Sequence, residues 1–368
     1  MKVKEITDIL ESFAPIQLKE DWDNVGLQIG HPEDEVNKVL LALTPSDLVI
    51  KEAIEKNVDM IITHHPFIFR GIKTLRADTA IGRMSRLCIK HDISLYCAHT
   101  NLDIAKGGVN DALAENLGLV NINGLERTET YPRYKLVVFI PKTHLEAVKT
   151  AIFNAGGGAQ GEYKNCAWST SGSGQFCPQE EASPYLGEVG RLETVEEIRL
   201  EVLVDEKDLN NVISAMKQAH PYEEVAYDVL RNEGQVQYEY LGRIGMLPTP
   251  KPLKEWLEDV KVALDIPVIT YTGDPNRMIE KVALCGGSAC EFITTAKDKG
   301  ADVYVTGDMK YHDAQQAVEI DLPMVDVSHY SGERVVLKKL YTLLRDAFGN
   351  RLQMEISQDE ESFIKYIK

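Results

Sequence analysis

The middle of this sequence repeats itself, and the repeat restricts how that part of the chain can fold. Apolar positions recur at an offset of 64 residues, as the pairs Leu136/Leu200, Val138/Val202, Ile140/Val204, Leu145/Leu209, Val148/Val212, Ala151/Ala215, Ala155/Ala219 and Tyr163/Tyr227. In each copy the apolar residues first alternate with a period of two and then recur with a helical period. The pattern of each copy indicates the order strand, helix, strand. Two copies predict a ferredoxin-like β-α-β-β-α-β domain. The stretch 169–190 between them is rich in Ser, Gly and Pro, so we expect a long loop or hairpin there.

The two ends of the chain alternate short apolar runs with amphipathic segments. We expect helices over 3–13, 48–56, 109–117, 253–264, 312–318 and 333–348, and strands over 39–43, 58–63, 93–98, 282–285, 302–306 and 323–327. Strand-helix alternation is typical of a mostly parallel α/β sheet. The fold class is therefore α/β, with one domain in two parts (1–128 and 240–368) and an inserted α+β domain at 129–239.

Five of the nine histidines follow predicted strands. They are His64 and His65 after one strand, His99 after the next, and His312 and His329 after two later strands. Ligands of α/β sheets bind at the carboxyl ends of the strands, and neutral imidazole is a common metal ligand. The adjacent pair His64-His65 points to opposite faces of a strand, which suits a polar site better than a core.

Two carboxylates complete a candidate ligand set. Asp103 follows the strand that precedes His99, and Glu333 lies four residues after His329, on the same face of a helical turn. Three imidazoles and two carboxylates exceed what one tetrahedral zinc ion needs. They suit two divalent ions about 3.5–4 Å apart, bridged by a carboxylate and a water. Zinc, iron and manganese all accept such ligands, and each feature alone also has a purely structural explanation.

Three further polar stretches each allow two interpretations. Gly286-Gly287-Ser288 after a strand could hold a phosphate or form a tight turn. Residues 21–26 could line a pocket or form a surface turn, and 220–224 could be a second site or the end of a helix followed by a strand.

The overall composition excludes several classes of partner. Lys and Arg number 40 against 57 Asp and Glu, so the formal net charge is −17, which disfavours nucleic acid as the primary partner. No stretch approaches the ~20 apolar residues of a membrane span, and the N-terminal segment has no signal-peptide pattern. The six cysteines show no close metal-type spacing, so we expect buried, reduced thiols and a cytoplasmic protein.

The sequence also contains motifs that carry a family resemblance: DWDNVGLQIG, IITHHPFIF, AHTNLDIAKGGVNDALAENLGL, TGDMKYHDAQQA and VDVSHYSGERVVL. With these motifs the chain resembles the NGG-interacting factor three-like family, whose bacterial members are called GTP cyclohydrolase 1 type 2 homologues. The middle of the chain, above all HPYEEVAYDV, is similar to the insert of the longer bacterial members, which is a CutA- or PII-like trimeric domain.

This resemblance implies a dinuclear metal site with two divalent ions per chain, zinc before iron or manganese. Its ligands would be His64, His65, Asp103, His329 and Glu333, with Glu333 as the bridge. The matching motifs would place His99 and His312 near the metals as catalytic, proton-transferring groups. The resemblance also implies a toroidal homohexamer whose metal sites face an internal cavity. One stretch departs from the family, because members usually carry an Asp after the first apolar run, where this chain has Leu43-Thr44-Pro45-Ser46-Asp47.

Two functions remain open at this point. The first is a metal-dependent, GTP cyclohydrolase-like hydrolase, in which a metal-bridging hydroxide attacks a small nucleotide-like or phosphorylated substrate. The second is a metallochaperone, or a metal- or ligand-responsive regulatory protein without turnover. The sequence shows no clear guanine-reading motif, so it does not choose the substrate.

Overall fold

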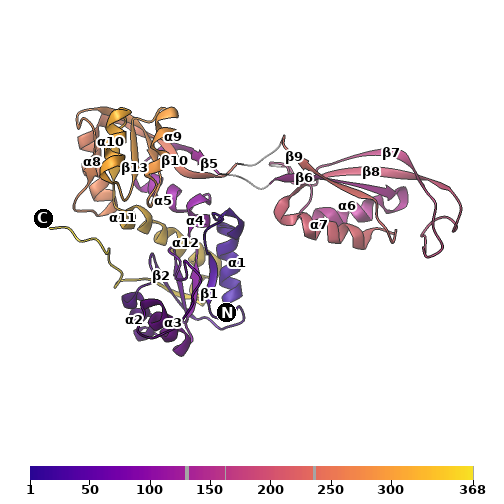
Figure 1. The fold of residues 1–368 in the computed structure, drawn as a ribbon, viewed down its shortest axis with the longest axis horizontal. Helices are drawn as coiled ribbons and strands as arrows, with labels where there is room; N and C mark the ends of the chain where they lie inside the picture. The colour runs from indigo at the N-terminus through magenta and orange to yellow at the C-terminus, as the bar shows by residue number, and fades with distance from the viewer. Residues whose placement is uncertain (129–131, 162, 235–237, 368) are drawn as a thin grey trace. The chain divides into compact units, whose positions relative to one another are not determined.

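The computed structural model describes residues 1–128, 132–161, 163–234 and 238–367, and the chain separates into two compact units (Figure 1). The first unit combines Met1–Thr128 with Glu239–Lys368, and the second is Glu129–Tyr238. The expected boundary at residue 129 lies outside the described residues, and the return to the first unit comes one residue before the expected position 240. Among the described residues, no helix is long and apolar enough to cross a membrane.

The first unit contains a five-stranded sheet to which both chain ends contribute. Its strands are, in spatial order, β1 (Gly26–Ile29), β4 (Ser94–Cys97), β3 (Met60–Thr63), β2 (Lys38–Ala42) and β15 (Gln353–Ile356). The four strands from β4 to β15 are parallel, and β1 is antiparallel to β4. β2 and β3 are buried almost throughout, as expected of apolar strands covered on both faces.

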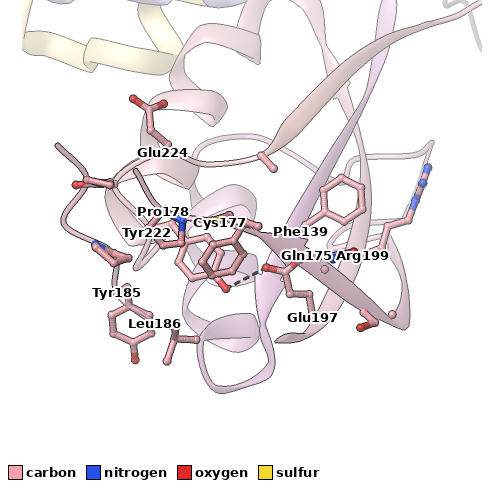
Figure 2. Close-up of a pocket in the computed structure, with 18 of the residues that line it drawn as sticks. Phe139, Gln175, Cys177, Pro178, Tyr185, Leu186, Glu197, Arg199, Tyr222 and Glu224 are labelled. Atoms are coloured by element: carbon pink, nitrogen blue, oxygen red, sulfur yellow. Dashed lines mark hydrogen bonds between the residues drawn. The ribbon is translucent and has the colours of Figure 1, made fainter. Parts of the chain in front are cut away.

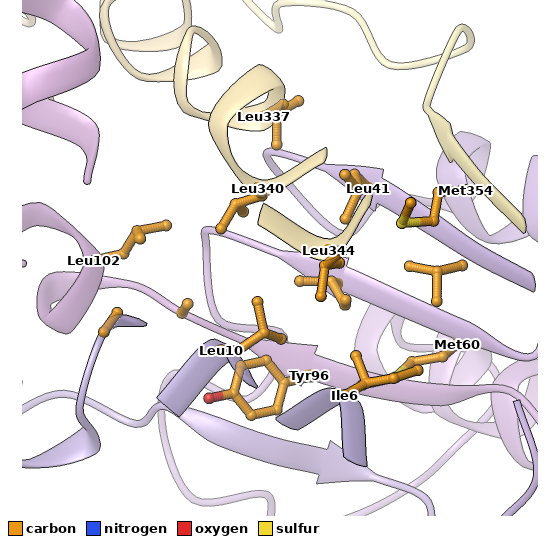
Figure 3. Packing of buried hydrophobic residues seen from close by; sticks show 14 of the residues in the cluster. Ile6, Leu10, Leu41, Met60, Tyr96, Leu102, Leu337, Leu340, Leu344 and Met354 are labelled. Atoms are coloured by element: carbon orange, nitrogen blue, oxygen red, sulfur yellow. The ribbon is translucent and has the colours of Figure 1, made fainter. Parts of the chain in front are cut away.

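Helices cover both faces of this sheet. On one face, α1 (Val3–Phe13) and α12 (Val336–Phe348) pack against it, and Figure 3 shows Ile6, Leu10, Leu340 and Leu344 meeting the strand residues. On the other face, apolar residues of α2 (Asp47–Glu55) and α3 (Ala80–Lys90) form a second cluster with the strands. α1 has the bounds that the amphipathic pattern predicts.

A second sheet of the first unit is formed mainly by the C-terminal part of the chain. Its order is β11 (Thr270–Tyr271), β14 (Met324–Asp326), β13 (Val303–Thr306), β12 (Met278–Leu284), β10 (Tyr240–Pro252) and β5 (Val120–Arg127). Apolar residues of α8 (Leu253–Leu264) pack in one cluster, and those of α9 (Ile293–Asp298) and α10 (Tyr311–Glu319) in another. The mixed α/β class is confirmed, but only β12, β13 and β14 are parallel here, so "mostly parallel" is wrong for this sheet.

The second unit has the strand-helix-strand order twice. Its elements are β6 (Arg133–Pro141), α6 (Leu145–Asn154), β7 (Ala167–Phe176), β8 (Glu193–Asp205), α7 (Glu206–Ala219) and β9 (Tyr227–Asn232), and the sheet order is β7-β8-β6-β9. All neighbouring strands are antiparallel. Leu136 pairs with Val202 and Val138 with Leu200, so each of these residues pairs with the repeat counterpart of the other.

Of the two expectations for 169–190, a long loop or a hairpin, the structure shows a hairpin with a long connection, because β7 pairs antiparallel with β8. Residues up to Phe176 belong to β7, which pairs with β8 from Ala167↔Val202 to Phe176↔Glu193. Its side chains are almost all exposed, because it is an edge strand that gains backbone hydrogen bonds without burying apolar groups. Only the part after Phe176 remains a loop.

The cysteines follow the expectation in part. Cys88, Cys97 and Cys285 are buried, and burial raises the pKa of the Cys88 thiol to about 11. Cys177 is exposed, because it begins the loop after β7 and not a buried strand.

Candidate metal centre

Five of the residues that sequence reasoning selected meet at the ends of strands. His64 and His65 directly follow β3, and Asp103 lies on α4 (Thr100–Ile104), which begins three residues after β4. His329 and Glu333 lie on α11 (His329–Arg334), which follows β14. Short apolar strands therefore fix the backbone, and the polar residues that follow the strand ends lie close together.

The Glu333 carboxylate lies at the centre of the cluster. Its Oε2 is 2.9 Å from His65 Nε2 and 3.2 Å from His329 Nε2, while its Oε1 is 3.7 Å from His64 Nε2. Asp103 Oδ1 lies 3.6 Å from the same His64 nitrogen. Two sets that could hold a metal ion thus share Glu333, one with His64 and Asp103 and the other with His65 and His329.

The Nδ1 atom of each imidazole contacts an oxygen, and each Nε2 points into the cluster. His64 Nδ1 lies 2.9 Å from the carbonyl oxygen of Ala98. His65 Nδ1 lies 2.8 Å from Thr44 Oγ1, and His329 Nδ1 lies 2.8 Å from Asp308 Oδ2. Since a carbonyl only accepts, His64 carries its proton on Nδ1, which leaves the Nε2 lone pair for a ligand. Oxygen contacts of this kind hold metal-binding histidines in one orientation.

Two buried atoms of the cluster indicate whether a cation fits between the ligands. Among the described residues, His64 Nε2 and Asp103 Oδ1 are buried and have no hydrogen-bond partner. Buried polar atoms are nearly always satisfied, so a pair left without partners calls for an explanation. A cation between the imidazole nitrogen and the carboxylate oxygen would satisfy both atoms, and the residues present therefore fit a metal ion.

The electrostatics of the cluster favour positive charge. Burial alone would lower the pKa of His64, but the carboxylates of Asp103 and Glu333 raise it to about 9. Burial raises the pKa of Asp103 to about 6, against the opposing effect of His64. For Glu333, burial acts to raise the pKa, but the surrounding imidazoles hold it well below its usual range. Two carboxylates in a buried site thus attract protons or cations to the imidazole nitrogens.

His99 lies beside this cluster and is held by a residue that the sequence left ambiguous. Its ring centroid is 5.1 Å from that of His64, and its Nδ1 is 2.9 Å from Asp23 Oδ1. Asp23 also accepts hydrogen bonds from the backbone N–H and hydroxyl of Thr100. Burial would raise the pKa of Asp23, but the bonds from His99 and Thr100 lower it to about 2. Residues 21–26 are therefore more than a surface turn, because the buried Asp23 holds His99 beside the cluster.

His312 is not brought into the cluster. It follows β13 as expected, but α10 begins at Tyr311 and its first turn leaves His312 exposed. Its Nδ1 lies 3.4 Å from Gln315 Oε1, and its ring packs against Tyr311. A proton-transfer role for His312 stays a prediction without support from this geometry.

Gly287 forms a tight turn against the cluster, which favours that interpretation over a phosphate-binding loop. Its φ is +72°, and a Cβ atom at this position would lie 2.5 Å from Glu333 Oε1. The backbone N–H of Gly307 donates to its carbonyl oxygen at 2.9 Å. Glycine is required here because it allows both the left-handed conformation and the approach of the carboxylate.

Comparisons with known proteins show what the whole chain is similar to. The family description Duf34/NIF3 (NGG1p interacting factor 3) matches residues 1–362. A Bacillus subtilis protein named GTP cyclohydrolase 1 type 2 homolog is 44% identical over 346 residues, which cover 93% of either chain. A Halalkalibacterium halodurans protein of the same name is 43% identical over 347 residues, which cover 93% of this chain and 92% of that protein. The crystal structure of a Bacillus cereus protein related to NIF3 is 41% identical, with a TM-score of 0.87, and covers 100% of this chain and 99% of its own.

Proposed function

The chain belongs to the Duf34/NIF3 (NGG1p interacting factor 3) family, and we propose that it binds two divalent metal ions and acts as a metal-dependent hydrolase. The observation that carries this proposal is the position of Glu333. Its Oε1 faces His64, and its Oε2 faces His65 and His329. A carboxylate placed between two groups of imidazoles is suited to bridge two ions.

The residues divide into two ligand groups with different access to solvent. His64 and Asp103 form the enclosed group, and the His64 side chain is 0% exposed. His65 and His329 form the open group, with side chains 21% and 34% exposed. A pair of divalent ions would polarise a substrate oxygen and lower the pKa of water. Three imidazoles favour zinc, and the two carboxylates also accept iron or manganese.

His99 is suited to move a proton at this site. Asp23 holds its Nδ1 side, so its Nε2 is the atom that remains to exchange a proton with a bound molecule. Its side chain is 17% exposed, which leaves it reachable beside the metal ligands. Removal of the Asp23 carboxylate would free the His99 ring to rotate. Such a variant would therefore test the orientation of His99 separately from metal binding.

The proposed substrate is small and nucleotide-like or otherwise phosphorylated. Trp22 and Phe69 are 59% and 46% exposed, and their rings are 5.8 Å apart. The Trp22 ring is also 6.1 Å from that of His99. Exposed aromatic rings beside a metal site can stack against a flat base, while the ions would attract phosphate. The name of the relatives, GTP cyclohydrolase 1 type 2 homolog, points to the same class of molecule.

Elemental analysis followed by a turnover assay tests the proposal. We expect about two divalent ions per chain after dialysis, consistent with a bridged pair. The metal-loaded protein is then assayed against nucleotides, including GTP, and phosphoesters, with the double variant His64→Ala, His65→Ala as control. If no substrate is turned over faster than by this variant, the hydrolase proposal fails.

The open half of the cluster favours a second candidate function, a metallochaperone or metal-responsive regulator. Accessible ligands such as His329 allow a metal ion to be exchanged with a partner. Transfer of radioactive zinc from the protein to an apo-enzyme within minutes, with no turnover in the substrate panel, would favour this candidate over the hydrolase.

A further inference from the structure

The second unit contains a cavity of about 680 Å³ that takes no part in the metal centre (Figure 2). The cavity lies on the sheet face opposite the helices. Val138 and Leu200 point into the core formed with α6 and α7, and the alternate residues Phe139 and Arg199 line the cavity. This volume is in the range of sites for small molecules.

The loop after β7 closes the cavity from one side. Pro178, Tyr185 and Leu186 of this loop line it. The loop is tied down at its base, where the backbone N–H of Gly190 donates to the carbonyl oxygen of Pro178 at 2.8 Å. At its middle, the backbone N–H of Ser183 donates to Glu223 at 2.9 Å. These two hydrogen bonds anchor the loop beside the cavity.

Aromatic side chains form much of the wall. The Tyr222 ring lies 6.2 Å from the rings of both Phe176 and Tyr185, and Figure 2 shows it directed toward Glu197. Phe139 lies on the floor, which is formed by the strands. Rings at these separations and inclined to one another offer both faces and edges to a flat ligand.

Glu197 is the polar group at the centre of this wall. Its Oε1 accepts a hydrogen bond from the Tyr222 hydroxyl at 3.0 Å. Gly174 on β7 lies diagonally across from Glu197, since the direct partner of Glu197 is Gly172, and a Cβ atom at Gly174 would lie 2.2 Å from Glu197 Oε2. The missing side chain at Gly174 lets the carboxylate lie against the strand. A carboxylate accepts about four hydrogen bonds, so Glu197 has capacity for a ligand.

The charge of the lining selects the sign of the ligand. Glu197, Glu223 and Glu224 line the cavity, and among the described lining residues Arg199 is the one basic side chain. Its guanidinium is already engaged, since Nε lies 3.0 Å from Glu201 and the group packs 5.8 Å from the Phe139 ring centre. The lining therefore favours a positively charged molecule or an N–H donor over a phosphate or carboxylate.

We propose that this cavity binds a small aromatic molecule with cationic N–H donors, such as an aryl amidine, a guanidine or an amino-substituted heterocycle. The flat ring lies among Phe139, Phe176 and Tyr222, and the N–H groups donate to Glu197. Every residue of this site belongs to the second unit, so the proposal is independent of the metal centre.

Calorimetric titration of the full-length protein with benzamidine tests the proposal. Benzoate, which has the same ring and the opposite charge, and cyclohexanecarboxamidine, which has the same charge and no aromatic ring, are the matched ligands. We expect saturable binding of benzamidine and binding at least about tenfold weaker for either matched ligand, as the loss of a charged hydrogen bond or of ring contacts implies.

Protein variants locate the binding. Glu197→Gln is expected to weaken benzamidine at least about tenfold, and Tyr185→Ala, a change in the exposed loop, by about fivefold. Glu196→Gln removes the same charge from the neighbouring residue, which does not line the cavity, and should leave binding unchanged. Equal binding of benzoate, or unchanged binding in Glu197→Gln, overturns the proposal. So does the absence of saturable benzamidine binding, which is the result if a second copy of the chain covers this face.

Discussion

The Glu360 carboxylate accepts a hydrogen bond from the backbone N–H of Thr44 at 2.6 Å, across 316 residues of sequence. It accepts a second bond from the N–H of Leu43 at 2.9 Å, and the Thr44 hydroxyl in turn contacts Nδ1 of the ligand His65. The C-terminal segment therefore fixes the turn that orients one imidazole of the cluster.

Glu360→Gln is expected to weaken metal binding, because an amide nitrogen would face one of the two backbone N–H donors and displace Thr44. Loss of a group that orients a ligand lowers metal affinity by about 10–100-fold. Competition with a zinc chelator measures the change. Glu361→Gln is the matched control, since Glu361 is exposed and bonds only to Lys365 among the described residues. Equal affinity in both variants would show that Glu360 only stabilises the fold.

Asp103→Asn and Glu333→Gln should differ in how many ions they lose. Asp103 contacts only the His64 side of the cluster, whereas Glu333 contacts both sides. We therefore expect Asp103→Asn to retain the ion at His65 and His329 and Glu333→Gln to lose both. Metal analysis after dialysis measures this, with thermal melting as the control for folding. Loss of both ions in Asp103→Asn would contradict two separable sites.

The ligand set could be predicted from the sequence because the ends of the buried strands can be recognised from the apolar pattern. The run 60–62 is apolar throughout, so the polar residues Thr63, His64 and His65 stand out directly after it. The family resemblance selects the same five residues. The hexamer and the PII-like character of the insert depend on that resemblance alone and stay predictions.

The residues that orient the ligands could not be predicted in the same way. Asp308 contacts His329 and Asp23 contacts His99, over separations of 21 and 76 residues. An aspartate in a turn has many possible partners, and only the folded chain selects one. The same is true of Glu360, because its partners are backbone N–H groups and no residue type in the sequence indicates them.

Several strands of the first unit, β10 among them, were not expected, and β7 was not expected to extend to Phe176. In β7 and β10 the side chains do not carry the usual signal. β7 is rich in Ser and Gly and lies at the edge of its sheet, where backbone pairing alone holds it. β10 spans Tyr240–Pro252 and changes register between Met246 and Lys251 against β12, so its apolar residues do not keep a period of two. Patterns of burial cannot reveal strands of either kind.

Asp111→Asn is expected to destabilise the first unit. Arg243 makes two bonds of 2.8 Å to the Asp111 carboxylate, and its side chain is 8% exposed. Removal of one partner from a buried ion pair costs about 3–5 kcal/mol, because the other charge stays buried. Urea denaturation followed by fluorescence at pH 7 measures the difference. A loss below about 1 kcal/mol, the level of an exposed pair, would contradict this account.

The same variant gives a pH dependence with a definite sign. Burial would raise the pKa of Asp111, but the Arg243 guanidinium lowers it overall. A carboxyl whose pKa is lowered in the folded state stabilises the protein above its unfolded value of about 3.9 and loses this contribution as the pH falls further. The stability difference between the parent chain and Asp111→Asn should therefore be constant above about pH 5 and shrink below pH 4. A difference that grows on acidification would contradict the assignment.

Gly287→Ala is expected to impair metal binding through contact with Glu333. The new Cβ atom would lie 2.5 Å from Glu333 Oε1, so the carboxylate must move away from His64. Gly300→Ala is the matched control, because the φ angle of Gly300 is +73°, against +72° at Gly287. The nearest atom to a Cβ added at Gly300 would be Lys281 Nζ at 3.8 Å, so no close contact results. Both variants should lose about 1 kcal/mol of stability from the left-handed backbone, and only Gly287→Ala should also release metal to a chelator more readily. Equal metal retention in the two variants would show that Glu333 can hold its ions without this close approach.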